Sequence, residues 1–255
     1  MTSKSSLRSK LIRSCKSRLF EFQNQCFRKI LTNEFLDKKN KELLYLGNSY
    51  SGYWIPNNLL DERGTIWGVG LGRDSSFEYH LLEKGYNFIG FEPEKDCFDQ
   101  SNKQFEGTSA VLENYGLWDK SGSFPYTGEN ISIVNIFDIS IASEELLEIR
   151  SLWAVADEKG LQNSKKPRIL KLNIEGAERE ILKRLIIEPL EFEVIIFQAE
   201  FLFHIGFKRL KKKIKAYREL RDILIGFQGL NWSIDDLSRH QITLIKSQYA
   251  SQLNK

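Results

Sequence analysis

Three alternating glycines, Gly68, Gly70 and Gly72, follow a short apolar segment and precede a predicted helix. Because glycine has no Cβ, a ligand can approach the main chain closely at such a turn. The helix start is indicated by Ser75 and Glu78, which have the spacing of a capping box, and its first N–H groups point toward the same ligand position. A strand, a glycine turn and a helix in this order therefore predict a ligand site at the turn.

A carboxylate stands at the end of the next predicted strand. The apolar segment 87–91 is followed at once by Glu92 and Pro93. An acid about 20 residues after a glycine turn commonly accepts hydrogen bonds from ribose hydroxyls. An ionised carboxylate has two acceptor oxygens, which suits two adjacent hydroxyl donors. Turn and acid together predict a cofactor that contains a nucleoside; the alternative is a tight strand–helix turn with a solvated acid.

Further polar residues follow two later apolar segments. The segment 168–172 ends at Asn173 and Glu175, and a helix is expected from about Gly176. The apolar segment 192–199 ends at Glu200, and His204 comes soon after it. Since ligands of an open parallel sheet bind outside the carboxyl ends of its strands, these residues are expected at the same edge as the glycine turn.

The elements that must position these residues alternate between strand and helix. Such alternation predicts a doubly wound α/β fold, in which a mostly parallel sheet carries helices on both faces. A third strand is expected over 108–114, and the segments 232–234 and 241–245 are predicted to close the sheet as an antiparallel pair. Helices are predicted over 94–104 and 144–157, and Phe124 to Tyr126 are expected to continue a hairpin.

Composition sets the class of protein. The chain has 255 residues, of which 28% are charged and 41% hydrophobic, values that are ordinary for a soluble globular protein. The net charge of +3 gives no argument for a nucleic-acid partner. Cys15, Cys26 and Cys97 are scattered, which argues against disulfides or a cysteine zinc site. No apolar run reaches the roughly 18 residues needed to span a bilayer, so a cytoplasmic protein is expected.

Residues 1–50 differ from the remainder, 51–255, which is expected to form the catalytic domain. Basic residues interleave with apolar ones at roughly helical spacing, and the first acid is Glu21. A basic amphipathic helix of this kind packs on its own domain, docks through residues 1–40 on a membrane surface or a partner protein, or serves as a targeting peptide. The sequence leaves these three interpretations open.

Both groups of motifs together resemble the FkbM family of S-adenosylmethionine-dependent methyltransferases. The similarity spans roughly residues 52–205 and is specific in the combination of motifs. The segments that carry it are Gly68-Val69-Gly70-Leu71-Gly72-Arg73-Asp74, Gly90-Phe91-Glu92-Pro93, Tyr115-Gly116-Leu117-Trp118-Asp119 and Leu170-Lys171-Leu172-Asn173-Ile174-Glu175-Gly176-Ala177-Glu178.

The resemblance implies a Rossmann-like, seven-stranded, doubly wound sheet of the class I methyltransferases, with an antiparallel last strand. It also implies S-adenosylmethionine as cofactor and methyl transfer to a hydroxyl of a sugar, glycan or related natural product, with no nucleic acid as partner. By position, the glycines border the methionine half and Glu92 holds the ribose. The remaining cofactor residues implied are Asp74, Asn114, Tyr115, Gly116 and Asn173. The family usually has Asp in place of Asn173, and an amide keeps the acceptor but loses the charge.

Methyl transfer to an alcohol calls for a base, because the hydroxyl is a poor nucleophile until its proton is taken. The candidates at the predicted edge are Glu175, Glu200 and His204, and the latter two are favoured because they follow the strand on the acceptor side. No strong metal-binding spacing is present.

Two other functions compete with this interpretation. A nicotinamide dehydrogenase would need glycine at Arg73 to complete the dinucleotide pattern, and the chain does not have it. Asn173 and the basic N-terminal segment also leave room for a protein of the same fold that binds a nucleoside, or nothing, and acts through partner contacts without catalysis.

Overall fold

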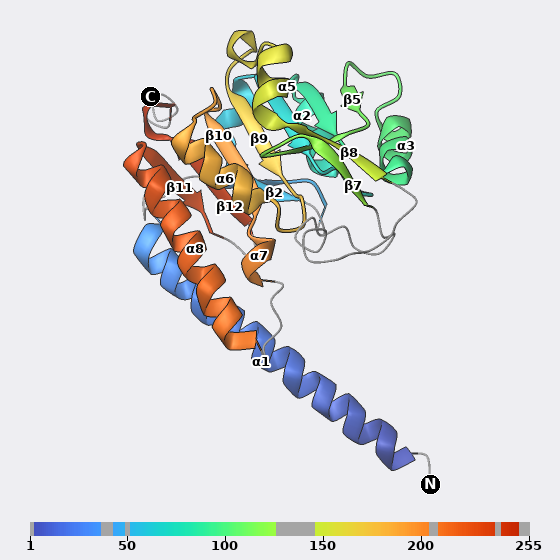
Figure 1. Cartoon of the computed structure of the whole chain (residues 1–255), viewed down its shortest axis with the longest axis vertical. Helices are drawn as coiled ribbons and strands as arrows, with labels where there is room; N and C mark the ends of the chain where they lie inside the picture. The colour runs from blue at the N-terminus through green and yellow to red at the C-terminus, as the bar shows by residue number, and fades with distance from the viewer. Residues whose placement is uncertain are drawn as a thin grey trace.

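The computed structural model describes residues 3–36, 43–48, 52–125, 146–203, 209–237 and 241–249. At its centre lies a seven-stranded sheet with the order β11-β12-β10-β9-β3-β4-β5 (Figure 1). The strands are β3 (Thr65–Val69), β4 (Asn87–Phe91), β5 (Val111–Glu113), β9 (Arg168–Leu172), β10 (Val194–Gln198), β11 (Trp232–Asp236) and β12 (Gln241–Lys246).

The sheet is mostly parallel. β5, β4, β3, β9 and β10 pair in parallel, whereas β12 is antiparallel to both of its neighbours, β10 and β11. This order and the antiparallel last strand confirm the predicted Rossmann-like fold of the class I methyltransferases. The predicted antiparallel pairing of the two C-terminal strands is confirmed as well.

The strand order reverses between β3 and β9. From β3 the chain moves outward through β4 to β5, and it then returns to the other side of β3 as β9. The loops that follow β3 and β9 therefore leave the sheet side by side and in opposite directions. In doubly wound sheets, this is the place where ligands bind.

Each face of the sheet packs on its own apolar layer, because successive side chains of a strand point to opposite faces. Trp67, Val69 and Leu170 belong to the layer that includes residues of α5 (Leu152–Glu158), α6 (Glu178–Ile187) and α8 (Leu210–Gly229). Ile66 and Ile169, one position earlier, belong to the opposite layer. That layer contains α2 (Ser76–Glu83) and the hairpin of β1 (Leu43–Leu46) with β2 (Tyr53–Pro56).

The predicted helix over 144–157 is wrong in its first half. Residues Leu146–Ser151 form strand β8, and the helix α5 begins only at Leu152. Leu147 and Ile149 are buried while their neighbours Leu146 and Glu148 are exposed, which is the two-residue period of a strand. The apolar residues of this segment fit both periods, so spacing alone did not separate the two.

β8 is the middle strand of a second, three-stranded sheet. It pairs in parallel with β6 (Gly116–Trp118) and antiparallel with β7 (Gly122–Pro125). The predicted hairpin is therefore wrong, since β6 and β7 both pair with β8 and not with each other. Tyr126 lies outside the described residues.

Most of the described N-terminal segment is one long helix. Helix α1 (Ser3–Phe35) packs along α8, and Figure 1 shows its N-terminal half extending away from the body of the protein. β1 precedes the predicted domain boundary at residue 51 and pairs with β2 beyond it. None of the described helices is long and apolar enough to cross a membrane.

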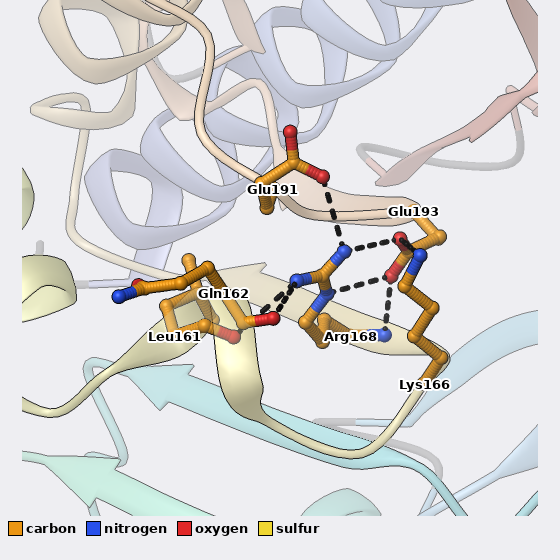
Figure 2. Close-up of polar contacts among 6 residues, drawn as sticks. All are labelled: Leu161, Gln162, Lys166, Arg168, Glu191 and Glu193. Atoms are coloured by element: carbon orange, nitrogen blue, oxygen red, sulfur yellow. Dashed lines mark hydrogen bonds and ion pairs between the residues drawn. The ribbon is translucent and has the colours of Figure 1, made fainter.

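The edge of the sheet where β9 and β10 begin is held by an ionic network around Arg168 (Figure 2). The guanidinium, 1% exposed, donates to both carboxylate oxygens of Glu193 at 3.1 and 2.7 Å. It also donates to Glu191 and to the main-chain oxygens of Leu161 and Gln162. The network ties the strand starts to the short helix η2 (Leu161–Asn163), at the edge opposite the glycine turn.

Candidate functional site

The glycine turn leaves β3 in a conformation that only glycine adopts without strain. Gly70 and Gly72 have φ angles of +76° and +59°, in the left-handed region. A Cβ on Gly70 would stand 2.0 Å from the main-chain oxygen of Asn173, whereas a Cβ on Gly72 would meet nothing within 4 Å. Gly70 therefore allows the turns after β3 and β9 to touch, and Gly72 leaves open space beside the main chain.

Gly68 has a different place. It lies within β3, and a Cβ there would stand 3.0–3.1 Å from Phe88, Glu78 and Leu71. The space beside Gly68 is filled by the protein's own side chains, so this glycine serves the packing of α2 on the sheet and does not border the open side of the turn.

Glu92 lies against the glycine turn and is 5% exposed. One carboxylate oxygen accepts hydrogen bonds from the main-chain N–H groups of Leu71 and Gly72 at 2.9 and 2.8 Å, and the other accepts from Glu94 at 2.9 Å. Burial raises the pKa of the Glu92 carboxyl above its ordinary value, although the three N–H donors act in the opposite direction. The side chain thus points toward the turn and fixes its shape.

The predicted capping box is wrong. Ser75 precedes α2, but its side chain makes no capping hydrogen bond and contacts Ser101 instead. Glu78 is buried in an ion pair with Lys171, at 2.9 Å between Oε1 and Nζ. Lys171, the fourth residue of β9, offers the carboxylate a stronger partner than a main-chain N–H.

Lys171 is the residue of this region for which the sequence suggested no role. Its ammonium donates to the main-chain oxygen of Gly70 at 2.8 Å and lies 5.7 Å from the centre of the Tyr53 ring. Burial acts to lower the pKa of Lys171, but the adjacent Glu78 carboxylate raises it above its ordinary value. The Glu78–Lys171 ion pair therefore stabilises the glycine turn through the hydrogen bond to Gly70. The sequence feature that could have indicated this role is a lysine within a mainly apolar strand.

Asp74 shapes the start of α2. Its carboxylate accepts from the main-chain N–H of Ser76 at 3.0 Å and from the side-chain amide of Asn48. Asn48 N–H in turn donates to the Ser76 hydroxyl at 3.0 Å. Asp74 therefore joins the glycine turn to the loop after β1, and its role in cofactor binding stays a prediction.

The turn after β5 lies next to Glu92. The side-chain amide of Asn114 donates to the Glu92 main-chain oxygen at 2.9 Å. Tyr115 is buried between the Phe91 ring, at 5.7 Å, and the Arg150 guanidinium, at 4.9 Å. The structure therefore brings this segment, whose residues were predicted to bind the cofactor, to the carboxyl end of β4. A Cβ on Gly116 would collide with the Ile149 side chain at 2.6 Å, so the space beside Gly116 is filled by the protein itself.

The turn after β9 is strained and polar. Glu175 has a φ of +53° and is exposed, and Gly176 N–H donates to the buried Glu178 carboxylate at 2.7 Å. A side chain other than glycine in this conformation costs about 1–3 kcal/mol and is common at functional sites. The Asn173 side-chain oxygen is buried, and it has no hydrogen-bond partner among the described residues.

The structure thus gathers Gly70, Gly72, Glu92, Asn114 and Asn173 at one edge of the sheet. Glu200 begins α7 (Glu200–Phe203) directly after β10, and its side chain lies outside the described part of the chain. His204 lies wholly outside the described residues. Within the described part, no group of three His, Cys, Asp or Glu side chains could hold a metal ion.

Comparisons with known proteins give solved structures only. No family model and no curated protein matches this chain. Fibrillarin from Methanococcus jannaschii has a TM-score of 0.40 at 8% identity, covering 83% of this chain and 86% of its own. Fibrillarin in a complex with Nop5p has a TM-score of 0.38 at 10% identity, covering 72% of this chain and 71% of its own.

A third similar structure was solved with bound ligands. The plantazolicin methyltransferase BpumL, in complex with a substrate analogue and SAH, has a TM-score of 0.28 at 13% identity, covering 89% of this chain and 69% of its own. Similarity at this level carries no argument about activity. The strand order of the seven-stranded sheet identifies the fold of this chain as that of the class I methyltransferases.

Proposed function

We propose that this chain is an S-adenosylmethionine-dependent methyltransferase that methylates a hydroxyl of a sugar, glycan or related natural product. One observation carries the proposal: Glu92 and the open side of the glycine turn at Gly72 meet where the strand order reverses. This is the place where a doubly wound sheet binds a nucleoside-containing ligand.

The chemistry of the side chains fits that cofactor. The two oxygens of Glu92 offer about four acceptor positions, three of which the main-chain N–H groups occupy, so one is left for a ribose hydroxyl. The buried side-chain oxygen of Asn173 is an acceptor for the ammonium of the cofactor's methionine half. A buried acceptor without a partner costs about 1–3 kcal/mol, and such a donor would relieve that cost.

When bound, S-adenosylmethionine supplies a methyl group that is already activated on a sulfonium. The chain's own part is to orient the cofactor and the acceptor oxygen in line and to take the hydroxyl proton. Glu200 and His204 follow β10 on the acceptor side and are the proposed bases. Glu175, exposed on the strained turn, is the third candidate.

Glu200→Gln and Glu175→Gln test the assignment of the base. Loss of the true base should lower turnover about 10²–10⁴-fold while S-adenosylhomocysteine binds as tightly as to the unaltered protein. Calorimetry measures the binding, and transfer of a radiolabelled methyl group to a panel of glycans measures turnover. Cofactor binding without transfer to any acceptor would instead support the non-catalytic alternative.

A further inference from the structure

The first half of α8 has an outward face made only of cationic and apolar side chains. Lys211, Ile214, Lys215 and Arg218 stand at i, i+3, i+4 and i+7, and all four are exposed. We call these four residues the basic face. It lies opposite the buried side of α8, which includes Lys213, Ala216 and Leu220.

The positive charge of the basic face is not neutralised within the described part of the chain. No described carboxylate forms an ion pair with Lys211, Lys215 or Arg218. The nearest acid in the sequence, Glu219, is engaged by Lys183 and Arg179 of α6.

Helix α1 extends this surface. It lies along α8, with the Phe27 and Tyr217 rings 5.1 Å apart and the Lys213 ammonium 4.4 Å from the centre of the Phe20 ring. Its 33 residues span about 50 Å, and its N-terminal half runs past the start of α8 and away from the sheet (Figure 1). The basic residues in that half, which has no acid, are Lys4, Arg8, Lys10, Arg13 and Lys16.

We propose that the basic face of α8 and the N-terminal half of α1 dock on an anionic lipid bilayer. Apolar side chains favour a bilayer over a nucleic acid, because they enter the interface between headgroups and acyl chains but gain nothing from a phosphate backbone. Ile214 is 36% exposed, and the adjacent Leu210 is 47% exposed.

The surface also lies on the side of the molecule that suits a membrane-borne acceptor. α7 follows β10 at the edge of the sheet that carries the glycine turn, and α8 contacts α7. Docking would bring that edge close to the lipid headgroups. The docking itself does not depend on the proposed methyl transfer and is measured without any cofactor.

Sedimentation of the full chain with phosphatidylcholine vesicles, with and without phosphatidylglycerol, tests the proposal. Binding is expected only with phosphatidylglycerol and should weaken as salt is raised. The triple variant Lys211→Gln, Lys215→Gln and Arg218→Gln should bind on the order of 100-fold more weakly, at about 1 kcal/mol for each charge near an anionic surface. Ile214→Asn should weaken binding further by several-fold.

A matched control removes three exposed positive charges elsewhere. Lys84→Gln, Lys103→Gln and Lys165→Gln change the net charge equally and should bind almost as the unaltered protein does. Equal binding to neutral and anionic vesicles, equal loss in both triple variants, or tighter binding to duplex nucleic acid than to anionic vesicles would overturn the proposal. Circular dichroism should give the same melting temperature for both variants, because all six positions are exposed.

Discussion

Alanine substitutions at three glycines with left-handed backbone conformation distinguish two energetic costs. One is the steric contact between the turns after β3 and β9, and the other is the backbone strain itself. Gly70, Gly72 and Gly107 have φ angles of +76°, +59° and +76°. A Cβ would meet the Asn173 oxygen at Gly70 and nothing within 4 Å at the other two positions. Gly107 lies after α3 (Lys95–Gln104), away from the glycine turn, and serves as the control.

The expected losses in the free energy of unfolding are larger for Gly70→Ala than for the other two variants. Holding alanine in the left-handed region costs about 1–2 kcal/mol, which is the whole expected effect of Gly72→Ala and Gly107→Ala. Gly70→Ala adds a main-chain contact of 2.0 Å. Neither the added Cβ nor the main-chain oxygen of Asn173 belongs to a flexible side chain, so the two turns must move apart. We therefore expect Gly70→Ala to lower the free energy of unfolding by about 3–5 kcal/mol in all.

Urea unfolding gives the three free energies, and calorimetry with S-adenosylhomocysteine gives the affinities. Gly72→Ala should unfold like Gly107→Ala yet lose cofactor affinity, because its methyl group enters the space that the cofactor would occupy. If Gly70→Ala were no more destabilising than Gly107→Ala, the contact between the turns would be refuted. Full affinity in Gly72→Ala would refute the position of the ligand.

Three further predictions concern the buried charges. Arg168→Met should lower the free energy of unfolding by about 3–5 kcal/mol, because the buried Glu193 carboxylate loses the guanidinium and keeps the more distant ammonium of the exposed Lys166, at 3.7 Å, as its cationic partner. Arg168→Met with Glu193→Gln should recover much of the loss. Urea unfolding measures both variants, and equal stability of Arg168→Met and the unaltered protein would contradict the network. Burial acts to raise the pKa of Glu193, but the hydrogen bonds from Arg168 hold it below its usual 4.5. The stabilisation from Glu193 is therefore complete above pH 4.5 and lost as the pH falls through the lowered value, a decline that should be smaller in Glu193→Gln when unfolding is measured across this range. Lys171→Met should cost about 3–5 kcal/mol and weaken cofactor binding, and Lys171→Met with Glu78→Gln should regain stability; a single variant that unfolds like the unaltered protein would count against the ion pair as support for the turn.

The sequence predicted the main sheet because its central strands are short apolar runs punctuated by glycine and by acids. β3 and β9 are buried along their whole length and β4 along most of it, so each is a mainly apolar segment with a clear end, interrupted in β9 by Arg168 and Lys171. Those ends also predicted Glu92 beside the glycine turn, since the carboxyl ends of parallel strands share an edge.

Other parts of the site depend on contacts between distant residues. Glu78 and Lys171 lie 93 positions apart in the chain, and nothing local to either residue indicates that one will be buried against the other. Asp74 likewise binds Asn48, which belongs to a different loop. The sequence did not predict strand β8, because β8 lies between β6 and β7, and nothing in the sequence indicates that it pairs with these two earlier strands.

Titration of S-adenosylhomocysteine into the full chain, followed by calorimetry, tests the central claim most directly. The account predicts one saturable site whose affinity falls in Gly72→Ala and remains in Gly107→Ala. No measurable binding of S-adenosylhomocysteine, or saturable binding of NADH in its place, would contradict it.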